Sequence, residues 1–308
     1  MQTGIDPKVD YAFKRVFAGS ECQDILPNLL NAVLMRSGAE RLTKIEVLNP
    51  FSQKETAQDK QIILDVKARD EKGHEFLIEM QMVAQPYFPE RLLFYLAKGY
   101  SQQMVEGDQW DVLRPVIVIC FINDVLCPQA TGYHGLYEML DQTTKVRFSD
   151  HWQLHLFELP KFQKSAEELT TDIERWTYFL QHGNELDPTA LPEALQIPEV
   201  RLATEVLRNM SLNALERHQY EARQRFLRDQ ATSLAYAEKS GIEKGIVIGS
   251  VLVTRESVIE IGILRLGPPP AHILTQLEGI NSVAQLKALR DRTLDCSTWD
   301  SLFDGSRE

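Results

Sequence analysis

The chain has 308 residues, of which 44% are hydrophobic and 25% are charged, and its formal net charge is −11. This length allows one large domain or two smaller ones, and the composition is typical of a globular protein. No apolar run reaches about eighteen residues, which argues against a membrane-spanning helix; the charged N-terminal segment does not resemble a secretory signal, and the negative charge argues against a broadly basic nucleic-acid-binding surface.

The chain has four cysteines, none of them in a Cys-x-x-Cys pair: Cys22, Cys120, Cys127 and Cys296. We therefore expect free thiols and a cytoplasmic location, where thiols stay reduced. His151 and His155 lie four residues apart, but no cysteine or third histidine is near them in the sequence. Two isolated histidines are more often structural or exposed than zinc ligands.

Two helices and a short strand are predicted at the start of the chain. The Asp-Pro pair at residues 6–7 is typical of a helix start, and apolar residues follow at helical spacing. Asp10 and Lys14 lie four residues apart on another face of this helix, where a surface ion pair is the simplest interpretation. A second amphipathic helix is predicted over residues 21–37 and a short strand over residues 45–48.

A β-hairpin is predicted next. Two runs rich in β-branched and apolar residues, 61–70 and 75–83, flank a turn that contains Gly73. Pairing Asp70 with His74 leaves a three-residue loop in which glycine can adopt the left-handed conformation.

The same register places Asp65 directly opposite Glu79. Because side chains alternate across a strand, Asp65 and Lys67 share one face of the hairpin with Glu79 and Gln81. Two carboxylates opposite each other repel and destabilise the strand pair. A hard divalent cation between them would remove that conflict, since Mg²⁺ is bound through carboxylate oxygens. The alternative is an ordinary hairpin with a solvated polar face.

The hairpin is followed by a predicted helix over residues 87–105. Arg91 and Lys98 occupy positions on this helix that could hold a phosphate, or could form a solvated helix edge. Residues 116–122 form a continuous apolar run, typical of a strand covered on both faces. A polar excursion, two short strand-like runs and an amphipathic helix follow at residues 123–143, 145–148, 153–159 and 165–180.

The last third of the chain is predicted to be helical. Residues 182–199 are rich in proline and polar residues, which favours a linker or boundary. Glycines at 241, 245 and 249 either permit close approach of another helix or mark a weakened joint. Residues 256–303 form a small helical unit in this interpretation. The resulting domains are residues 1–185, a linker with a helical extension at 186–250, and a C-terminal module at 251–308.

Several longer segments occur in one order: DPKVDYAFKRVF at 6–17, LNAVL at 30–34, IEVLNP at 45–50, DKQIILDVKARDEKGHEFLIEMQ at 59–81, RLLFYLAKGYSQQM at 91–104 and LRPVIVI at 113–119. With the spacing Asp-(thirteen residues)-Glu-x-Gln, they resemble the family of recombination-promoting nucleases and transposases, within the PD-(D/E)xK nuclease superfamily. The resemblance covers roughly the first two-thirds of the chain.

This resemblance implies an α/β, restriction-endonuclease-like core with a mixed central sheet flanked by helices, followed by a helical C-terminal region. It implies that Asp65 and Glu79 coordinate Mg²⁺ or Mn²⁺. Gln81 stands where the superfamily usually has lysine and supplies no positive charge, so Lys67 is a candidate substitute. Many relatives place an acid from the first helix near the metal. The candidate secondary residues are Asp10, Lys14, Arg91 and Lys98.

The resemblance therefore predicts a Mg²⁺-dependent DNA endonuclease of the recombination-promoting, transposase-like type, with DNA as its partner. The acidic net charge and Gln81 favour an alternative. In that alternative the chain is a catalytically weak or inactive nuclease-fold protein that acts as an interaction or regulatory module. A homo-oligomer formed through the helical C-terminal region is a further expectation.

Overall fold

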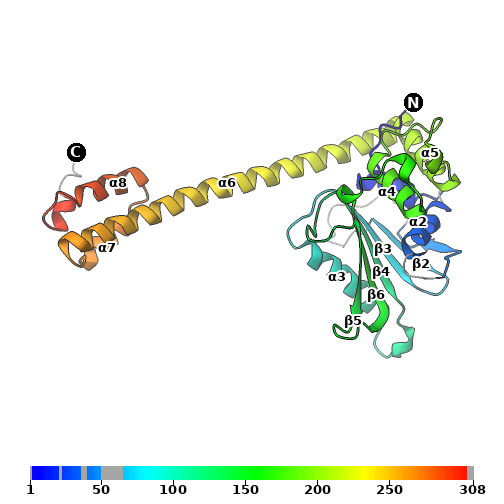
Figure 1. The fold of residues 1–308 in the computed structure, drawn as a ribbon, viewed down its shortest axis with the longest axis horizontal. Coiled ribbons are helices and arrows are strands. Elements are labelled where there is room, and N and C mark those ends of the chain that lie inside the picture. The colour runs from blue at the N-terminus through cyan, green and yellow to red at the C-terminus, as the bar shows by residue number, and fades with distance from the viewer. Residues whose placement is uncertain (1, 21–22, 36–39, 50–64, 304–308) are drawn as a thin grey trace. The chain divides into compact units, whose positions relative to one another are not determined.

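The computed structural model of the chain describes residues 2–20, 23–35, 40–49 and 65–303 (Figure 1). No helix within these ranges has both the length and the apolar character needed to cross a membrane. The chain divides into two compact units, Met1–Arg225 and Phe226–Glu308.

A mixed sheet forms the centre of the first unit, and its described strands follow the order β1-β2-β3-β4-β6-β5. Neighbouring strands are antiparallel at β1–β2, β2–β3 and β5–β6, and parallel at β3–β4 and β4–β6. The strands are β1 (Ile45–Val47), β2 (Val66–Asp70), β3 (Glu75–Gln81), β4 (Val116–Ile122), β5 (His134–Leu140) and β6 (Arg147–Glu158). This α/β arrangement with a mixed central sheet confirms the predicted fold class.

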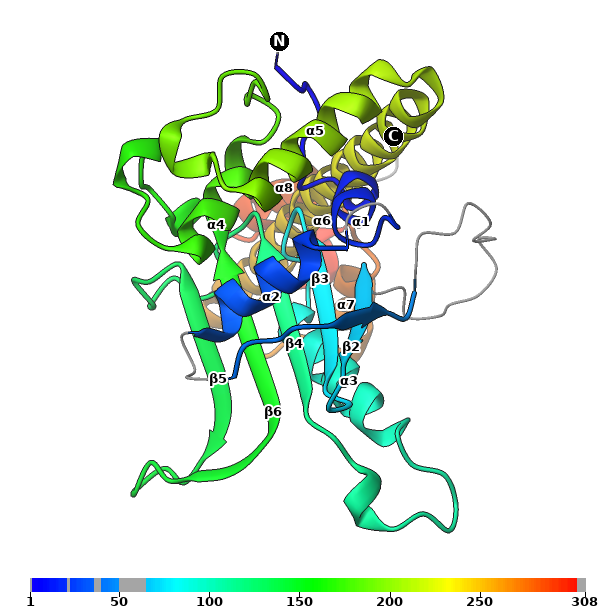
Figure 2. The ribbon, with the colours of Figure 1, turned by 90° about the vertical axis from the view of Figure 1, so that its right-hand side faces the viewer.

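Helices cover both faces of this sheet, with α3 on one face and α2 on the other (Figures 1 and 2). The helices of the first unit are α1 (Asp10–Phe17), α2 (Ile25–Leu34), α3 (Phe88–Ser101), α4 (Asp172–His182), α5 (Pro198–Leu212) and the first turns of α6 (Ala214–Leu266). Short 3₁₀ helices are η2 (Trp110–Val112), η3 (Leu159–Lys161), η4 (Ala166–Glu168) and η5 (Glu193–Leu195).

Strand β4 is buried along its whole length, as its apolar sequence predicts. Val118 and Cys120 belong to the core cluster that includes Leu92 of α3. Phe121 points to the opposite face, where its ring centroid lies 6.3 Å from that of Phe13 in α1. Burial on both faces explains why this strand lacks alternating polar residues.

The described part of the predicted hairpin forms in the predicted register, and residues 61–64 of the prediction lie outside the described residues. Val66 pairs with Ile78, and the N–H of Asp70 donates to the carbonyl oxygen of His74 over 3.1 Å. Gly73 adopts the left-handed conformation with φ of +84°, which glycine tolerates without strain. The hairpin differs from a solvated ribbon, because α3 packs on the face that carries the polar residues and β3 is buried except at its last residue.

Several element boundaries differ from the sequence prediction. Helix α1 begins at Asp10, because Asp6 accepts the backbone N–H of Lys8 (2.9 Å) and forms a turn before the helix. Helix α4 begins at Asp172 rather than at residue 165, after a capping box between Thr171 and Glu174. Its cap fixes the start because Thr171 satisfies a backbone donor in the first turn.

The segment around β5 and β6 also differs. Residues 123–143 were expected to be irregular but contain β5, an edge strand whose half-exposed side chains give no clear alternation. The two runs expected at 145–148 and 153–159 are one strand, β6. Register shifts on either side of Met139 accommodate the polar residues between those runs.

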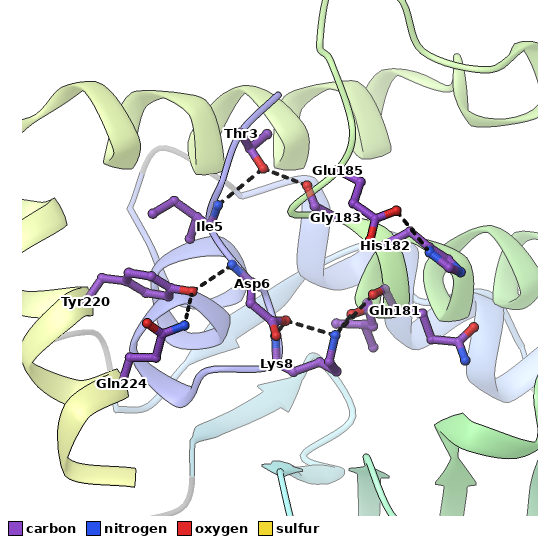
Figure 3. A network of polar contacts seen from close by, with 11 residues as sticks. Thr3, Ile5, Asp6, Lys8, Gln181, His182, Gly183, Glu185, Tyr220 and Gln224 are labelled. Atoms are coloured by element: carbon purple, nitrogen blue, oxygen red, sulfur yellow. Dashed lines mark hydrogen bonds and ion pairs between the residues drawn. The ribbon is translucent and has the colours of Figure 1, made fainter. Parts of the chain in front are cut away.

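The first unit extends beyond residue 185, into the segment expected to be a linker. The N–H of Thr3 donates to the carbonyl of Leu186 (3.0 Å), and Leu195 and Val200 are fully buried. Figure 3 shows how the N-terminal segment joins these parts: the N–H of Asp6 donates to the Tyr220 hydroxyl of α6 over 2.9 Å. These contacts place α5 and the start of α6 in the first unit.

The second unit has its own small apolar core, formed by α6 with α7 (Ala271–Glu278), α8 (Val283–Arg292) and η6 (Asp300–Leu302). Gly262 is required there, because a β-carbon at that position would lie 2.0 Å from the ring of Trp299. Helix α6 continues without a break through Gly241, Gly245 and Gly249. The expected module at 251–308 falls inside this unit.

Candidate active site

Two buried carboxylates lie opposite each other at the open end of the hairpin. Asp65 immediately precedes β2, and the observed register, extended by one residue, places it across from Glu79 in β3. Their exposed fractions are 7% and 6%. The N–H of Met80 donates to Oδ2 of Asp65 over 2.7 Å, which fixes the Asp65 carboxylate against β3. We call Asp65, Glu79 and Gln81 the open end of the hairpin.

Burial dominates the electrostatics of this pair. Burial, and then the charge of Glu79, raises the pKa of Asp65 well above its ordinary range. Burial also raises the pKa of Glu79 to about 7, although the guanidinium of Arg91 lowers it. The charge of Asp10 raises, and that of Lys14 lowers, the pKa of both carboxyls, so α1 brings these two charges close to the pair.

The residues at the open end fit a hard cation. Among the described residues, Oε2 of Glu79 is buried and has no hydrogen-bond partner. A buried carboxylate oxygen without a partner is costly unless a cation or a proton satisfies it. Within those same residues no group of three or more metal-ligating side chains converges. Asp65 and Glu79 would therefore hold the ion as two carboxylate ligands, which is sufficient for Mg²⁺ because it usually keeps several waters.

Gln81 lies on the same side of β3 as Glu79, because one guanidinium contacts both side chains. Nη2 of Arg91 donates to Oε1 of Gln81 over 2.7 Å and to Oε1 of Glu79 over 3.3 Å. The amide nitrogen of Gln81 donates to the carbonyl of Val83 (2.8 Å). Both ends of the Gln81 amide are thus held in place.

Lys67 and Lys98 are not brought to the open end. Nζ of Lys67 lies 2.9 Å from Oε2 of Glu75, close to the turn of the hairpin. Lys98 follows Arg91 by seven residues in α3, which places it about 10 Å further along the helix axis. The neighbouring Gly99 packs against Leu77, so this part of α3 lies over the first half of β3.

Asp10 is bound by a residue that sequence reasoning did not find. Nε of Arg223 lies 2.8 Å from each oxygen of the Asp10 carboxylate, and Nη2 lies 2.5 Å from Oδ2. Arg223 belongs to α6 and is 213 residues away in the sequence. Only the long-range packing of α6 on α1 reveals this ion pair, because no local pattern marks Arg223.

His151 and His155 each have one hydrogen-bonding contact, and Nε2 of His155 is buried with no partner among the described residues. Nδ1 of His151 contacts the Tyr100 hydroxyl (2.9 Å), and Nδ1 of His155 contacts His134 (3.0 Å). Burial lowers the pKa of His155 to about 4, so it stays neutral. A cavity of about 380 Å³ near Lys72 lies at the turn of the hairpin, away from Asp65 and Glu79.

A family model matches most of this chain. Residues 7–237, well over half of the chain, match the model of the PD-(D/E)XK nuclease family transposase. Neither the curated proteins nor the solved structures contain a match. The matched range includes both buried carboxylates, and the mixed sheet flanked by helices agrees with the restriction-endonuclease-like fold of these nucleases. The chain therefore belongs to the PD-(D/E)XK nuclease family transposases.

Proposed function

We propose that this chain is a Mg²⁺-dependent DNA endonuclease of the recombination-promoting, transposase-like type, which hydrolyses phosphodiester bonds. The observation that supports this function is the buried pair Asp65 and Glu79 with an unsatisfied carboxylate oxygen. Two adjacent buried carboxylates cost free energy in a protein without a bound cation. Such an arrangement is typical of a site that gains a positive ligand.

The residues of the open end have distinct roles in this proposal. Bound Mg²⁺ would supply positive charge to the phosphate and lower the pKa of a coordinated water. Asp65 and Glu79 hold the ion, and the N–H of Met80 keeps the Asp65 carboxylate oriented. Gln81 uses its amide to position water or substrate by hydrogen bonding, since it carries no charge.

The acidic net charge bears on how this chain would bind DNA. The net charge of −11 disfavours binding over a large surface. A nuclease of this kind would depend on a few cations near the site and on the metal to offset the phosphate charge. We therefore expect weak, strongly salt-dependent binding to DNA.

The second candidate function is an inactive nuclease fold that acts as an interaction or regulatory module. The neutral Gln81 in the usual lysine position favours it. An inactive protein would still bind the cation if Asp65 and Glu79 remain ligands, so metal binding and cleavage have to be measured separately.

Cleavage of supercoiled plasmid with Mg²⁺, Mn²⁺ or EDTA tests the proposal. The protein should cleave with either metal and not with EDTA, and Asp65→Asn purified in the same way should not cleave. Melting curves with and without Mg²⁺ report binding of the ion by mass action. Stabilisation without cleavage would support the second candidate, and cleavage that persists in Asp65→Asn or in EDTA would contradict the proposed site.

A further inference from the structure

We propose that Arg91 of α3 supplies the positive charge that Gln81 lacks and contacts the phosphate that is cleaved. This inference rests on the proposed nuclease function. It assigns to a helix residue the electrostatic role for which the sequence suggested Lys67.

The contacts of Arg91 place its charge at the open end of the hairpin. Its Nη2 bridges Gln81 (2.7 Å) and Glu79 (3.3 Å), while Nη1 donates to Oε1 of Gln85 over 3.1 Å. Within the described part of the chain, Arg91 is the only cationic side chain seen in contact with Glu79 or Gln81. Its side chain is 29% exposed, so a phosphate can reach it from solvent.

Arg91 also has hydrogen-bonding capacity left. Its Nε is buried and has no acceptor among the described residues. A buried donor without an acceptor is destabilising, and an anion that accepts from it would remove this cost. The planar guanidinium matches the oxygens of a phosphate with two parallel donors, which favours arginine for this contact.

Aromatic side chains of α3 hold the guanidinium in position. The guanidinium carbon lies 4.7 Å from the ring centroid of Phe88 and 5.8 Å from that of Tyr95. Residues three and four apart lie on one face of a helix, so Phe88, Arg91 and Tyr95 are presented together to β3. Both rings are buried, and cation–π contacts of this kind restrict an arginine without neutralising it.

Lys67 does not meet these conditions. Its ammonium is paired with Glu75 at 2.9 Å. Its position in the register is opposite Leu77, two residues before Glu79. Recruiting Lys67 to the open end would break an ion pair to a buried carboxylate, whereas Arg91 already lies beside Glu79 and Gln81.

The charge of Arg91 would act on the transition state. In hydrolysis, the oxygen of a water molecule bonds to phosphorus and the bond from phosphorus to one ester oxygen breaks. The water gives up a proton, and the departing ester oxygen takes one up. Negative charge on the non-bridging oxygens is stabilised by a preorganised cation, which typically contributes about 10²–10³ in rate.

Charge removal and charge rescue test this inference. We expect Arg91→Gln to lower the cleavage rate about a hundredfold and Arg91→Lys to retain part of the activity. The double variant Arg91→Gln/Gln81→Lys should cleave faster than Arg91→Gln alone, because it returns a cation to the same side of β3. A purely structural role for Arg91 predicts no such rescue.

Arg147→Gln is the matched control. It makes the same substitution at an arginine that also contacts a carboxylate, Glu138 (2.8 Å), but on β6 rather than beside the open end. Its cleavage rate should equal that of the unmodified protein. Melting curves of all variants identify any that fail to fold. If Arg91→Gln does not fold, the cleavage rates of Arg91→Lys and of the double variant Arg91→Lys/Gln81→Lys are compared instead.

Binding to a fluorescent DNA duplex in EDTA separates this inference from the proposed function. Loss of the Arg91 phosphate contact should weaken binding. It should also reduce the slope of the logarithm of the binding constant against the logarithm of salt concentration by about one. If the unmodified protein cleaves DNA and Arg91→Gln cleaves and binds it equally well, the role of Arg91 is overturned and the nuclease function stands. Unmodified protein that does not cleave would overturn the nuclease function, and equal binding by Arg91→Gln would then also overturn the phosphate contact.

Discussion

The β2–β3 hairpin carries buried carboxylates at both of its ends, and their surroundings differ. Near the turn, Glu75 is 3% exposed, accepts a hydrogen bond from Arg69 (2.7 Å) and forms an ion pair with Lys67 (2.9 Å). At the open end, Asp65 and Glu79 are buried to a similar degree but face each other. Oε2 of each glutamate is buried and has no hydrogen-bond partner among the described residues, but that of Glu75 lies 2.9 Å from the Lys67 ammonium.

This difference separates a structural carboxylate from a candidate ligand. Burial does not distinguish the two ends, since Glu75 and Glu79 belong to the same strand and have similar exposure. The available cations do distinguish them. Glu75 has two cationic partners, and a buried charge of this kind contributes to a stable fold. Glu79 shares one guanidinium with Gln81 and lies beside a second carboxylate, an arrangement that favours binding of a further cation.

The largest expected effect comes from Asp65→Asn. This change removes one negative charge but keeps an oxygen that can accept the N–H of Met80. We expect metal-dependent cleavage to fall about a thousandfold, the upper range for loss of one electrostatic group. The rise in melting temperature caused by Mg²⁺ should disappear. Undiminished cleavage, or an unchanged response to Mg²⁺, would show that Asp65 is not a ligand.

A pH effect on stability is expected next in size. The pKa of Glu79 rises from 4.5 to about 7 in the folded protein, and that of Asp65 rises as well. Between these pH values the folded state binds more protons than the unfolded state, so stability in EDTA should fall as pH increases from 4.5 through 7. The shift of Glu79 alone corresponds to a loss of about 3 kcal/mol, and the raised pKa of Asp65 adds to it.

Melting curves in EDTA at pH 5.5 and pH 8 measure this effect. The double variant Asp65→Asn/Glu79→Gln is the control, since it lacks both titrating groups and should depend less on pH. Mg²⁺ should stabilise the protein more at the higher pH, because ligands must be deprotonated to bind the ion. An equal pH dependence in the protein and the double variant would contradict the raised pKa values.

Glu75→Gln should change stability and leave cleavage intact. It removes the charge that holds Lys67 and Arg69 while keeping the size of the side chain. Because both partners are partly exposed, we expect a loss of about 2 kcal/mol, below the range for fully buried pairs. Urea denaturation measures the loss. A folded Glu75→Gln protein that cleaves as poorly as Asp65→Asn would remove the distinction between the two ends.

The open end could be predicted from the sequence because its geometry is local. A side-chain period of two and a turn with glycine at residue 73 fix the register of two adjacent strands. That register is enough to bring Asp65 and Glu79 together over a spacing of thirteen residues. Strand β4 could also be predicted from the sequence, because a continuous apolar run by itself is typical of a strand that is buried on both faces.

The surroundings of that site could not be predicted, because they depend on tertiary packing. The hairpin alone favoured a solvated polar face, and only α3 shows that Leu77 and Glu79 are covered. Helical spacing marked Arg91 as a candidate without showing which strand it faces. The ion pair between Asp10 and Arg223 joins positions at opposite ends of the matched range. Such pairs have no local signal.

The smallest expected effect is that of Lys67→Gln. Glu75 keeps its hydrogen bond from Arg69 in this variant, so we expect a loss of only about 0.5–1 kcal/mol, as for a partly exposed ion pair. Cleavage should stay within about twofold of the unmodified protein, because the Lys67 ammonium is paired with Glu75 rather than with a residue of the open end. Urea denaturation and plasmid cleavage measure both quantities on one preparation. A large fall in cleavage with little loss of stability would instead assign the missing charge to Lys67, and Arg91 would then hold Glu79 and Gln81 in place without acting on the phosphate.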